Sequence, residues 1–128
     1  MNIFQKISYI AEVEFSDIVE IVEESEDKLR IYLKDGSFID IWFSMKIIGR
    51  YAYHWERSHI DGKIYRHDNI PHKKWEYVKT FPKHFHCGFE KEVTESSISN
   101  EPEDAIREIL LFSRKILQES VSESTTAC

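Results

Sequence analysis

Two Asp-Gly pairs, each set between segments of alternating apolar and polar residues, constrain the fold of this chain most strongly. They are Asp35-Gly36 and Asp61-Gly62. Asp and Gly tolerate the positive φ of a tight turn, and such pairs are the strongest short signal for a β-hairpin. The sequence therefore predicts two hairpins in succession. Their strands are expected at residues 28–34, 37–44, 50–58 and 63–68.

Two-residue turns would fix the pairing in both hairpins. The first would pair Leu33 with Phe38, Ile31 with Asp40, and Leu29 with Trp42. The second would pair Arg57 with Arg66, Trp55 with Asp68, and Tyr53 with Ile70, leaving His54, Glu56, His67 and Asn69 on the other face. A slip of one residue would exchange the two faces of a strand. In the predicted pairing of the first hairpin, Asp40 would lie on an otherwise apolar face. It would need a partner there, such as Arg66 or a histidine, unless Asp40 sets the register at a sheet edge.

Helical patterns flank this β-rich region. Apolar residues recur at helical spacing over residues 3–11, and residues 106–117 carry a longer apolar stripe after a capping sequence at Asn100–Glu103. Residues 18–22 predict one more strand, and His84–His86 a last one. We therefore expect an α+β fold, an antiparallel five- to six-stranded meander sheet packed with N- and C-terminal helices. Residues 1–118 would form a single domain, and 119–128 a disordered polar tail.

Length and composition narrow the class of protein. A chain of 128 residues suits one domain, and it has no apolar run of the roughly 20 residues that a membrane span needs. The N-terminus lacks the pattern of a signal peptide, so we expect a cytoplasmic protein that does not enter a membrane. Cys87 and Cys128 do not indicate a disulfide framework, and the absence of a CxxC motif argues against a zinc knuckle.

Charge is distributed unevenly. The net charge is −6, yet residues 45–91 sum to +5 and contain all six histidines, while the rest of the chain sums to −11. A locally positive region can attract an anion such as a nucleic-acid backbone. The alternative is an ordinary solvated surface of mixed charge.

Chemically versatile residues concentrate between Arg50 and His86. Histidine titrates near neutral pH and suits acid–base catalysis, Arg and Lys stabilise negative charge on phosphate, and aromatic rings can stack on bases. Together they predict a metal-independent ribonuclease in which His72 and His84 exchange protons and Asp68 orients an imidazole. The predicted catalytic residues are His72, His84, His86, Arg66 and Asp68. The predicted substrate-binding residues are Tyr51, Tyr53, His54, Asn69 and Lys83.

Two other interpretations fit the same residues. No cofactor is expected for the acid–base mechanism, but a divalent metal is the alternative. The candidate ligands are Asp68, His72, His84 and His86. In the structural interpretation the tyrosines belong to the core, Arg66 and Asp68 form an ion pair, and residues 69–72 form a turn fastened by side-chain hydrogen bonds.

Several motifs resemble those of a known family. They are Asp35-Gly36-Ser37, Tyr51-Ala52-Tyr53-His54, Arg66-x-Asp68-Asn69-x-Pro71-His72 and Thr80-Phe81-Pro82-x-His84-x-His86. In this combination the chain resembles the TumE-type toxins of toxin–antitoxin systems, from about Lys28 to the C-terminal helix. The resemblance implies a small prokaryotic toxin with a cognate antitoxin, often a helix-turn-helix protein. RNA cleavage is an analogy with other small toxins. The alternatives are a metal- or ligand-binding module and a non-catalytic interaction protein whose acidic flanks bind a basic partner.

Overall fold

The computed structural model describes residues 1–119 and residue 128. A short α-helix that continues as a π-helical turn comes first, seven strands follow, and a longer helix ends the described part. The helical elements are α1 (Ile3–Tyr9), η1 (Ile10–Glu14), η2 (Lys73–Trp75) and α2 (Pro102–Glu119). The strands are β1 (Val19–Glu24), β2 (Lys28–Leu33), β3 (Phe38–Phe43), β4 (Tyr51–Arg57), β5 (Lys63–Asp68), β6 (His84–Gly88) and β7 (Val93–Glu95).

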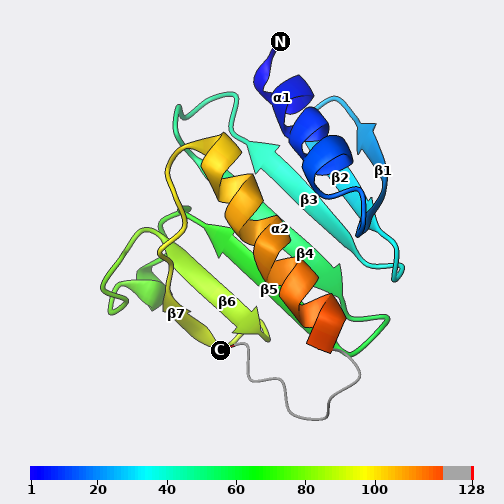
Figure 1. The fold of residues 1–128 in the computed structure, drawn as a ribbon. Coiled ribbons are helices and arrows are strands. Elements are labelled where there is room, and N and C mark those ends of the chain that lie inside the picture. The colour runs from blue at the N-terminus through cyan, green and yellow to red at the C-terminus, as the bar shows by residue number, and fades with distance from the viewer. Residues whose placement is uncertain (120–127) are drawn as a thin grey trace.

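The strands form one antiparallel sheet in the order of the sequence, β1 to β7. Both α1 and α2 lie on the same face of this sheet (Figure 1). The predicted α+β class, the antiparallel meander and the two terminal helices are confirmed. The sheet has seven strands instead of the predicted five or six. The unexpected strand, β7, is a three-residue edge in which only Val93 is apolar, so it carries almost no alternating pattern.

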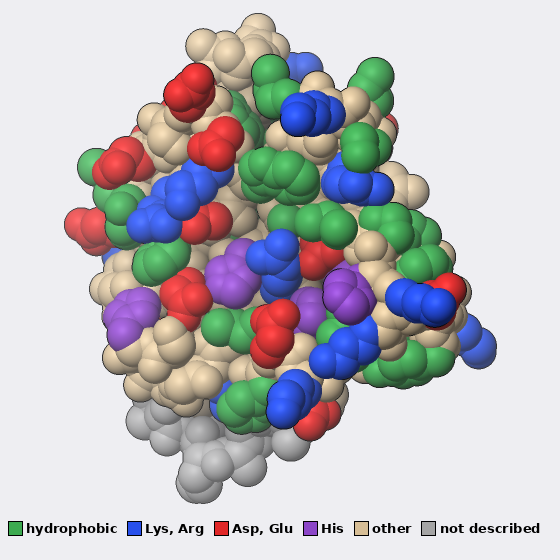
Figure 2. Space-filling model, turned by 180° about the vertical axis from the view of Figure 1, so that it is seen from behind, with side chains coloured by type: hydrophobic (Ala, Val, Ile, Leu, Met, Phe, Trp, Pro, Cys, Tyr) green, Lys and Arg blue, Asp and Glu red, His purple; other side chains and the backbone are tan. Residues whose placement is uncertain are grey.

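The core lies between the sheet and the helices. Leu29, Ile31 and Ile41 from the strands are completely covered, as are Ile106 and Leu110 from α2. Ile106 and Leu110 belong to one apolar stripe of α2. This stripe packs on the sheet, while the polar side of the helix faces solvent. Neither α1 nor α2 covers the opposite face of the sheet, which Figure 2 shows from behind. We call it the open face.

The first hairpin is shifted by one residue from the predicted register. Ile31 pairs with Ile39 instead of Asp40, and Asp40 pairs with Arg30. The predicted pairing is wrong because the connecting loop spans residues 34–37 and is longer than two residues. Asp40 consequently lies on the open face, where its carboxylate forms an ion pair with Arg30 at 2.7 Å. The partners suggested by the sequence, Arg66 or a histidine, do not form that ion pair.

The second hairpin also departs from the predicted register. His54 pairs with Arg66, and Trp55 pairs with Tyr65 instead of Asp68. The connecting loop is again longer than two residues, and the change in register exchanges the faces of one strand relative to the other. Arg66 and Asp68 therefore share the open face with His54.

Asp35 fastens the first hairpin to β4. Its Oδ1 accepts hydrogen bonds from the backbone N–H and hydroxyl of Ser37, and its Oδ2 accepts one at 2.6 Å from the buried guanidinium of Arg57. Ser37 in turn accepts a hydrogen bond from the indole N–H of Trp55. Burial favours a higher pKa for Asp35, but the hydrogen bonds from Ser37 and the charge of Arg57 outweigh it and lower the pKa.

We expect Asp35→Ala to lower the free energy of unfolding by about 2 kcal/mol at neutral pH, because Ser37 and Arg57 lose a buried partner. The folded state lowers the pKa of this carboxyl. Its stabilisation is therefore present above the unfolded pKa of about 3.9 and is lost as the pH falls through the lower folded-state pKa. Urea unfolding of both proteins over this pH range measures the effect. Asp61→Ala is the control, because Asp61 also contacts Arg57 but its side chain is 34% exposed against 24% for Asp35. Equal losses for the two variants, or a difference that persists in acid, would contradict the expectation.

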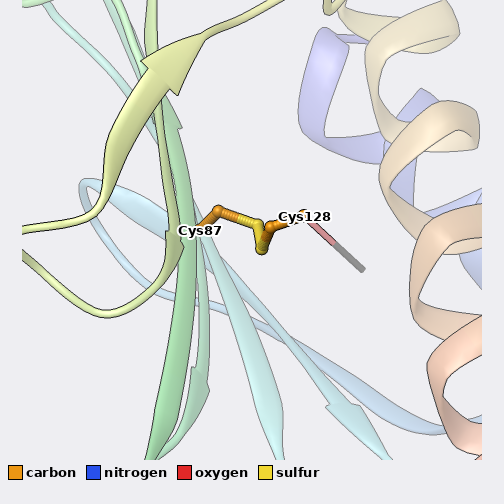
Figure 3. The surroundings of a disulfide bond; sticks show 2 residues. All are labelled: Cys87 and Cys128. Carbon is orange, nitrogen blue, oxygen red and sulfur yellow. A yellow bond between two sulfur atoms is a disulfide. The ribbon is translucent and has the colours of Figure 1, made fainter. Parts of the chain in front are cut away.

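The end of the chain returns to the sheet. Cys128 forms a disulfide with Cys87 of β6, on the side of the sheet that faces α2 (Figure 3). The sequence did not indicate this disulfide, since the spacing of the two cysteines does not reveal that they meet. The predicted disordered tail falls largely on residues 120–127, which lie outside the described residues; Glu119 is still part of α2. In the described part, no helix has the length and hydropathy to cross a bilayer.

Candidate functional site

A row of polar side chains crosses the open face from β2 to β6. Direct cross-strand partners connect them in turn: Arg30 with Asp40, Asp40 with His54, His54 with Arg66, and Arg66 with His86. The row therefore contains one basic, acidic or imidazole side chain from each of five neighbouring strands. Figure 2 shows this face, where histidines lie among basic and acidic groups.

Asp68, His84 and His86 meet where β5 pairs with β6. Asp68 is the direct cross-strand partner of His84, and all three residues are buried, between 2% and 4% exposed. Candidate ligand atoms, one from each residue, lie within 4.8 Å of one another. His84 Nε2 is 3.3 Å from Asp68 Oδ1, and the two imidazole rings are nearly perpendicular with centroids 4.9 Å apart. We call these three residues the Asp-His-His cluster.

Backbone carbonyls fix the orientation of both imidazoles. His84 Nδ1 lies 3.0 Å from the carbonyl oxygen of Pro82, and His86 Nδ1 lies 2.7 Å from that of Glu90. A carbonyl oxygen can only accept, so both Nδ1 atoms donate their hydrogen. In the neutral form of each ring, the lone pair is therefore on Nε2.

Hydrogen bonds also hold the carboxylate of Asp68 in place. Arg66 Nε donates to Oδ2 at 2.8 Å, and the backbone N–H of Ile70 donates to Oδ1 at 2.9 Å. The predicted ion pair of Arg66 and Asp68 is therefore present, and it is part of the cluster's support. Because Asp68 is the last residue of β5, the turn that follows supplies the second donor.

A hollow of about 230 Å³ lies over the cluster. Its wall also includes His72, Trp75 and Glu90. A second hollow, of about 400 Å³, adjoins it and shares Arg66 and Ile70. Trp42 and His54 line this second hollow. The two hollows together form a groove with Arg66 at its middle and a tryptophan on each side.

The pKa values of two histidines are shifted. Burial lowers the pKa of His86, although the carbonyl and charge of Glu90 oppose the shift. Burial also lowers the pKa of His67 to about 4, with the charge of Lys83 acting in the same direction. His67 belongs to the other face, where it stacks on Phe85, so its predicted placement beside His54 is wrong. A lowered pKa favours the neutral form of both imidazoles.

The structure brings the five predicted catalytic residues together around one hollow. They are Arg66, Asp68, His72, His84 and His86. Among them, His84 is buried.

The predicted substrate-binding residues separate. His54 lines the groove, but Tyr51 and Tyr53 belong to the core on the helix side. Burial, with the nearby charge of Asp68, raises the pKa of Tyr51 to about 12. Asn69 accepts a hydrogen bond from the backbone N–H of Tyr51 and donates one to the carbonyl of Gly49, so its side chain holds the start of β4.

Lys83 is directed away from the cluster, because its ammonium group donates to the carbonyl of Ile98. Sequence reasoning did not identify Trp42, Trp75 or Glu90 as groove residues. The two tryptophans belong to no recognisable motif. A tryptophan among polar residues of a surface strand or turn can nevertheless indicate a binding groove. Glu90 lies in the β6–β7 turn, and nothing in its sequence context indicates that its carbonyl holds an imidazole.

One of the comparisons with known proteins identifies a family. A family model described as Toxin TumE matches residues 4–119. The match includes both terminal helices, the whole sheet and the Asp-His-His cluster. Neither the comparison with curated proteins nor the comparison with solved structures gave a match.

Proposed function

The chain belongs to the TumE toxin family, and from this premise we propose that it is the toxin of a toxin–antitoxin pair and cleaves RNA at the Asp-His-His cluster. The observation that carries the proposal is the convergence of two buried imidazoles on one carboxylate, at the floor of a groove beside Arg66. Buried polar groups are costly to the fold, and their convergence in a hollow is typical of functional sites.

The groove suits single-stranded RNA. Trp42 and Trp75 are half-buried side chains on either side of Arg66, with part of each ring available to a ligand. Bases of an unpaired strand can stack on such rings, and the guanidinium can bind the phosphate between them. A base-paired strand would not present its bases to these rings. We therefore favour an unpaired segment as the substrate.

Cleavage at the phosphate requires two proton transfers. A base removes the proton of the ribose 2′-hydroxyl, O2′ forms a bond to phosphorus, and the bond from phosphorus to O5′ breaks as O5′ receives a proton. The products are a 2′,3′-cyclic phosphate and a free 5′-hydroxyl. Arg66 would stabilise the extra negative charge of the transition state.

The identity of the second proton-transfer group needs revision. The sequence suggested His72 together with His84. His72 is exposed, and its Nδ1 accepts a hydrogen bond at 3.1 Å from the backbone N–H of Lys74. Protonation at Nδ1 would remove that hydrogen bond, so His72 is poorly placed to act as an acid. His86 lies next to His84, and its neutral form has a lone pair on Nε2, so it replaces His72 as the candidate base within the cluster.

The partner is proposed to be a cognate antitoxin, with a helix-turn-helix protein encoded by the neighbouring gene as the expected type. This proposal rests on the family, because nothing in the groove specifies the fold of a partner. An antitoxin could act by covering the open face, which neither α1 nor α2 covers.

We expect expression of the full chain alone to stop growth of its native host, and co-expression of the neighbouring gene to restore it. RNA from the arrested cells should contain new ends that carry a 5′-hydroxyl, as the transesterification requires. Sequencing of 5′-hydroxyl ends, with and without the partner, measures both. Normal growth of cells that accumulate the folded chain would contradict the toxin role. Arrest without new RNA ends would retain that role and reject RNA as the target.

A further inference from the structure

We propose that the Asp-His-His cluster binds one divalent transition-metal ion, through Nε2 of His84, Nε2 of His86 and the carboxylate of Asp68. The inference deepens the proposed function, on which it rests only for the use of the ion in RNA cleavage. Binding of the ion itself is a separate property that can be measured without RNA.

The orientation of the imidazoles carries the first step. Both Nδ1 atoms donate to backbone carbonyls, so both Nε2 atoms offer lone pairs near the carboxylate of Asp68. Metal-binding histidines characteristically donate their other ring N–H to a carbonyl or carboxylate, which fixes the tautomer. The contacts with Pro82 and Glu90 provide that support.

Electrostatics carries the second step. Three atoms with lone pairs, two of them nitrogens and one a charged oxygen, meet in a buried volume. Such atoms repel one another unless a positive charge lies between them. A proton can bridge only two of them, for example His84 Nε2 and Asp68 Oδ1. A metal ion can satisfy all three at once.

The distances carry the third step. His84 Nε2 and Asp68 Oδ1 are 3.3 Å apart. Two ligands at about 2.1 Å from one ion have this separation when the angle between them is about 104°, close to tetrahedral. His86 completes the set within 4.8 Å, so the side chains need only a small closure to reach bonding distance.

The surrounding charges are mixed. Arg66 opposes a cation, but its Nε contacts Oδ2 of Asp68 and leaves Oδ1 facing His84. Glu90 lines the same hollow and contributes a negative charge. An arginine that holds the second oxygen of a ligating carboxylate is also a common form of support, because it orients the first oxygen toward the ion.

The ligand set selects the class of ion. Two imidazoles and one carboxylate suit Zn²⁺ and other first-row divalent ions, whereas Mg²⁺ and Ca²⁺ prefer oxygen ligands alone. Three protein ligands leave at least one position open toward the hollow, as in catalytic sites. With both Nε2 atoms bound to the ion, the two imidazoles would hold it instead of transferring protons. The ion would then supply the catalytic chemistry, by lowering the pKa of a coordinated water and polarising a phosphoryl oxygen.

Titration of untagged, chelator-treated full-length protein with Zn²⁺, and separately with Co²⁺ as a spectroscopic probe, tests the inference. We expect one ion per chain, and a visible Co²⁺ absorption of low-symmetry nitrogen and oxygen ligation. His84→Asn and His86→Asn should each weaken binding by at least about tenfold. Asparagine places an amide N–H near the position of Nδ1, so it can keep the hydrogen bond to the carbonyl while removing Nε2.

His59→Asn is the matched control, because His59 is exposed on another loop, where its Nε2 contacts the carbonyl of Gly36. The thermal midpoint of the wild type should rise with Zn²⁺, since an ion that binds only the folded state stabilises it. The same rise should be absent from the two cluster variants, whose circular dichroism should match the wild type. Absence of stoichiometric binding, or binding that His59→Asn weakens as much as His84→Asn, would overturn the proposal.

The readouts separate this inference from the proposed function. Stoichiometric binding by a protein that leaves all RNA intact would support the metal site and reject RNA cleavage. Cleavage by metal-free protein in excess EDTA, together with no Zn²⁺ binding, would support RNA cleavage and reject the metal site. The imidazoles alone would then be the catalytic groups.

Discussion

His84→Asn is expected to lower the rate of RNA cleavage by about 10²-fold or more, and to remove the growth arrest that the wild type causes. The reason is the loss of Nε2, which faces Asp68 at 3.3 Å and serves either as a proton-transfer group or as a metal ligand. Asparagine can retain a donor to the carbonyl of Pro82, so the variant should fold. Alanine would be a poorer choice, because His84 is buried and its removal would leave a cavity.

The measurement is single-turnover cleavage of a short unpaired RNA, with the growth assay beside it. His59→Asn controls for the loss of any histidine, and His86→Asn should resemble His84→Asn. Matched melting temperatures would exclude unfolding as the cause. A His84→Asn protein that cleaves at the wild-type rate would remove the cluster from the mechanism, whatever the wild type does to growth.

The class of fold could be predicted because it depends on local signals. Asp35-Gly36 and Asp61-Gly62 mark turns, and the apolar stripe of α2 marks a surface helix. The register could not be predicted, because it depends on how many residues the loop contains. Asp35 accepts two hydrogen bonds from Ser37, which lengthens the first loop and shifts the pairing of β2 with β3 by one residue.

The candidate site could be predicted as a set of residues but not as an arrangement. The density of histidines identified Asp68, His84 and His86, and strand periodicity correctly placed the two histidines on one face. The predicted register of the second hairpin had placed Tyr53 on the same face as Asp68. Only the observed register shows that Tyr53 is in the core and that the set shares its face with His54.

Contacts between segments that are distant in the chain could not be predicted from the sequence. The carbonyl of Glu90 holds His86 because a turn returns the chain beside β6, and no side-chain pattern records a backbone contact. The bond of Cys87 to Cys128 depends in the same way on where the end of the chain lies. Lys83 looked like a phosphate ligand by proximity in sequence, yet it donates to Ile98.

Leu110→Ala is expected to lower the free energy of unfolding by about 3 kcal/mol, because it removes buried methyl groups and leaves a cavity between α2 and the sheet. Leu110 is completely covered, and the core it belongs to joins α2 to β4 and α1. The adjacent Leu111 is 54% exposed and provides a matched control on the same helix. Both substitutions delete the same atoms and change helix propensity equally, so their difference measures burial.

Urea unfolding with the disulfide intact, analysed with a common slope, gives the two free energies. Leu111→Ala should stay within about 0.5 kcal/mol of the wild type. The loss expected for Leu110→Ala also tests the function. The reason is that α2 covers the side of the sheet opposite the Asp-His-His cluster and supports β5 and β6 from behind. If Leu110→Ala is destabilised as expected but still folded at low temperature, its cleavage rate there should be close to wild type, because the cluster is held by β5, β6 and their turns. Equal stability losses for the two leucines would show that α2 is not packed on the sheet along this stripe.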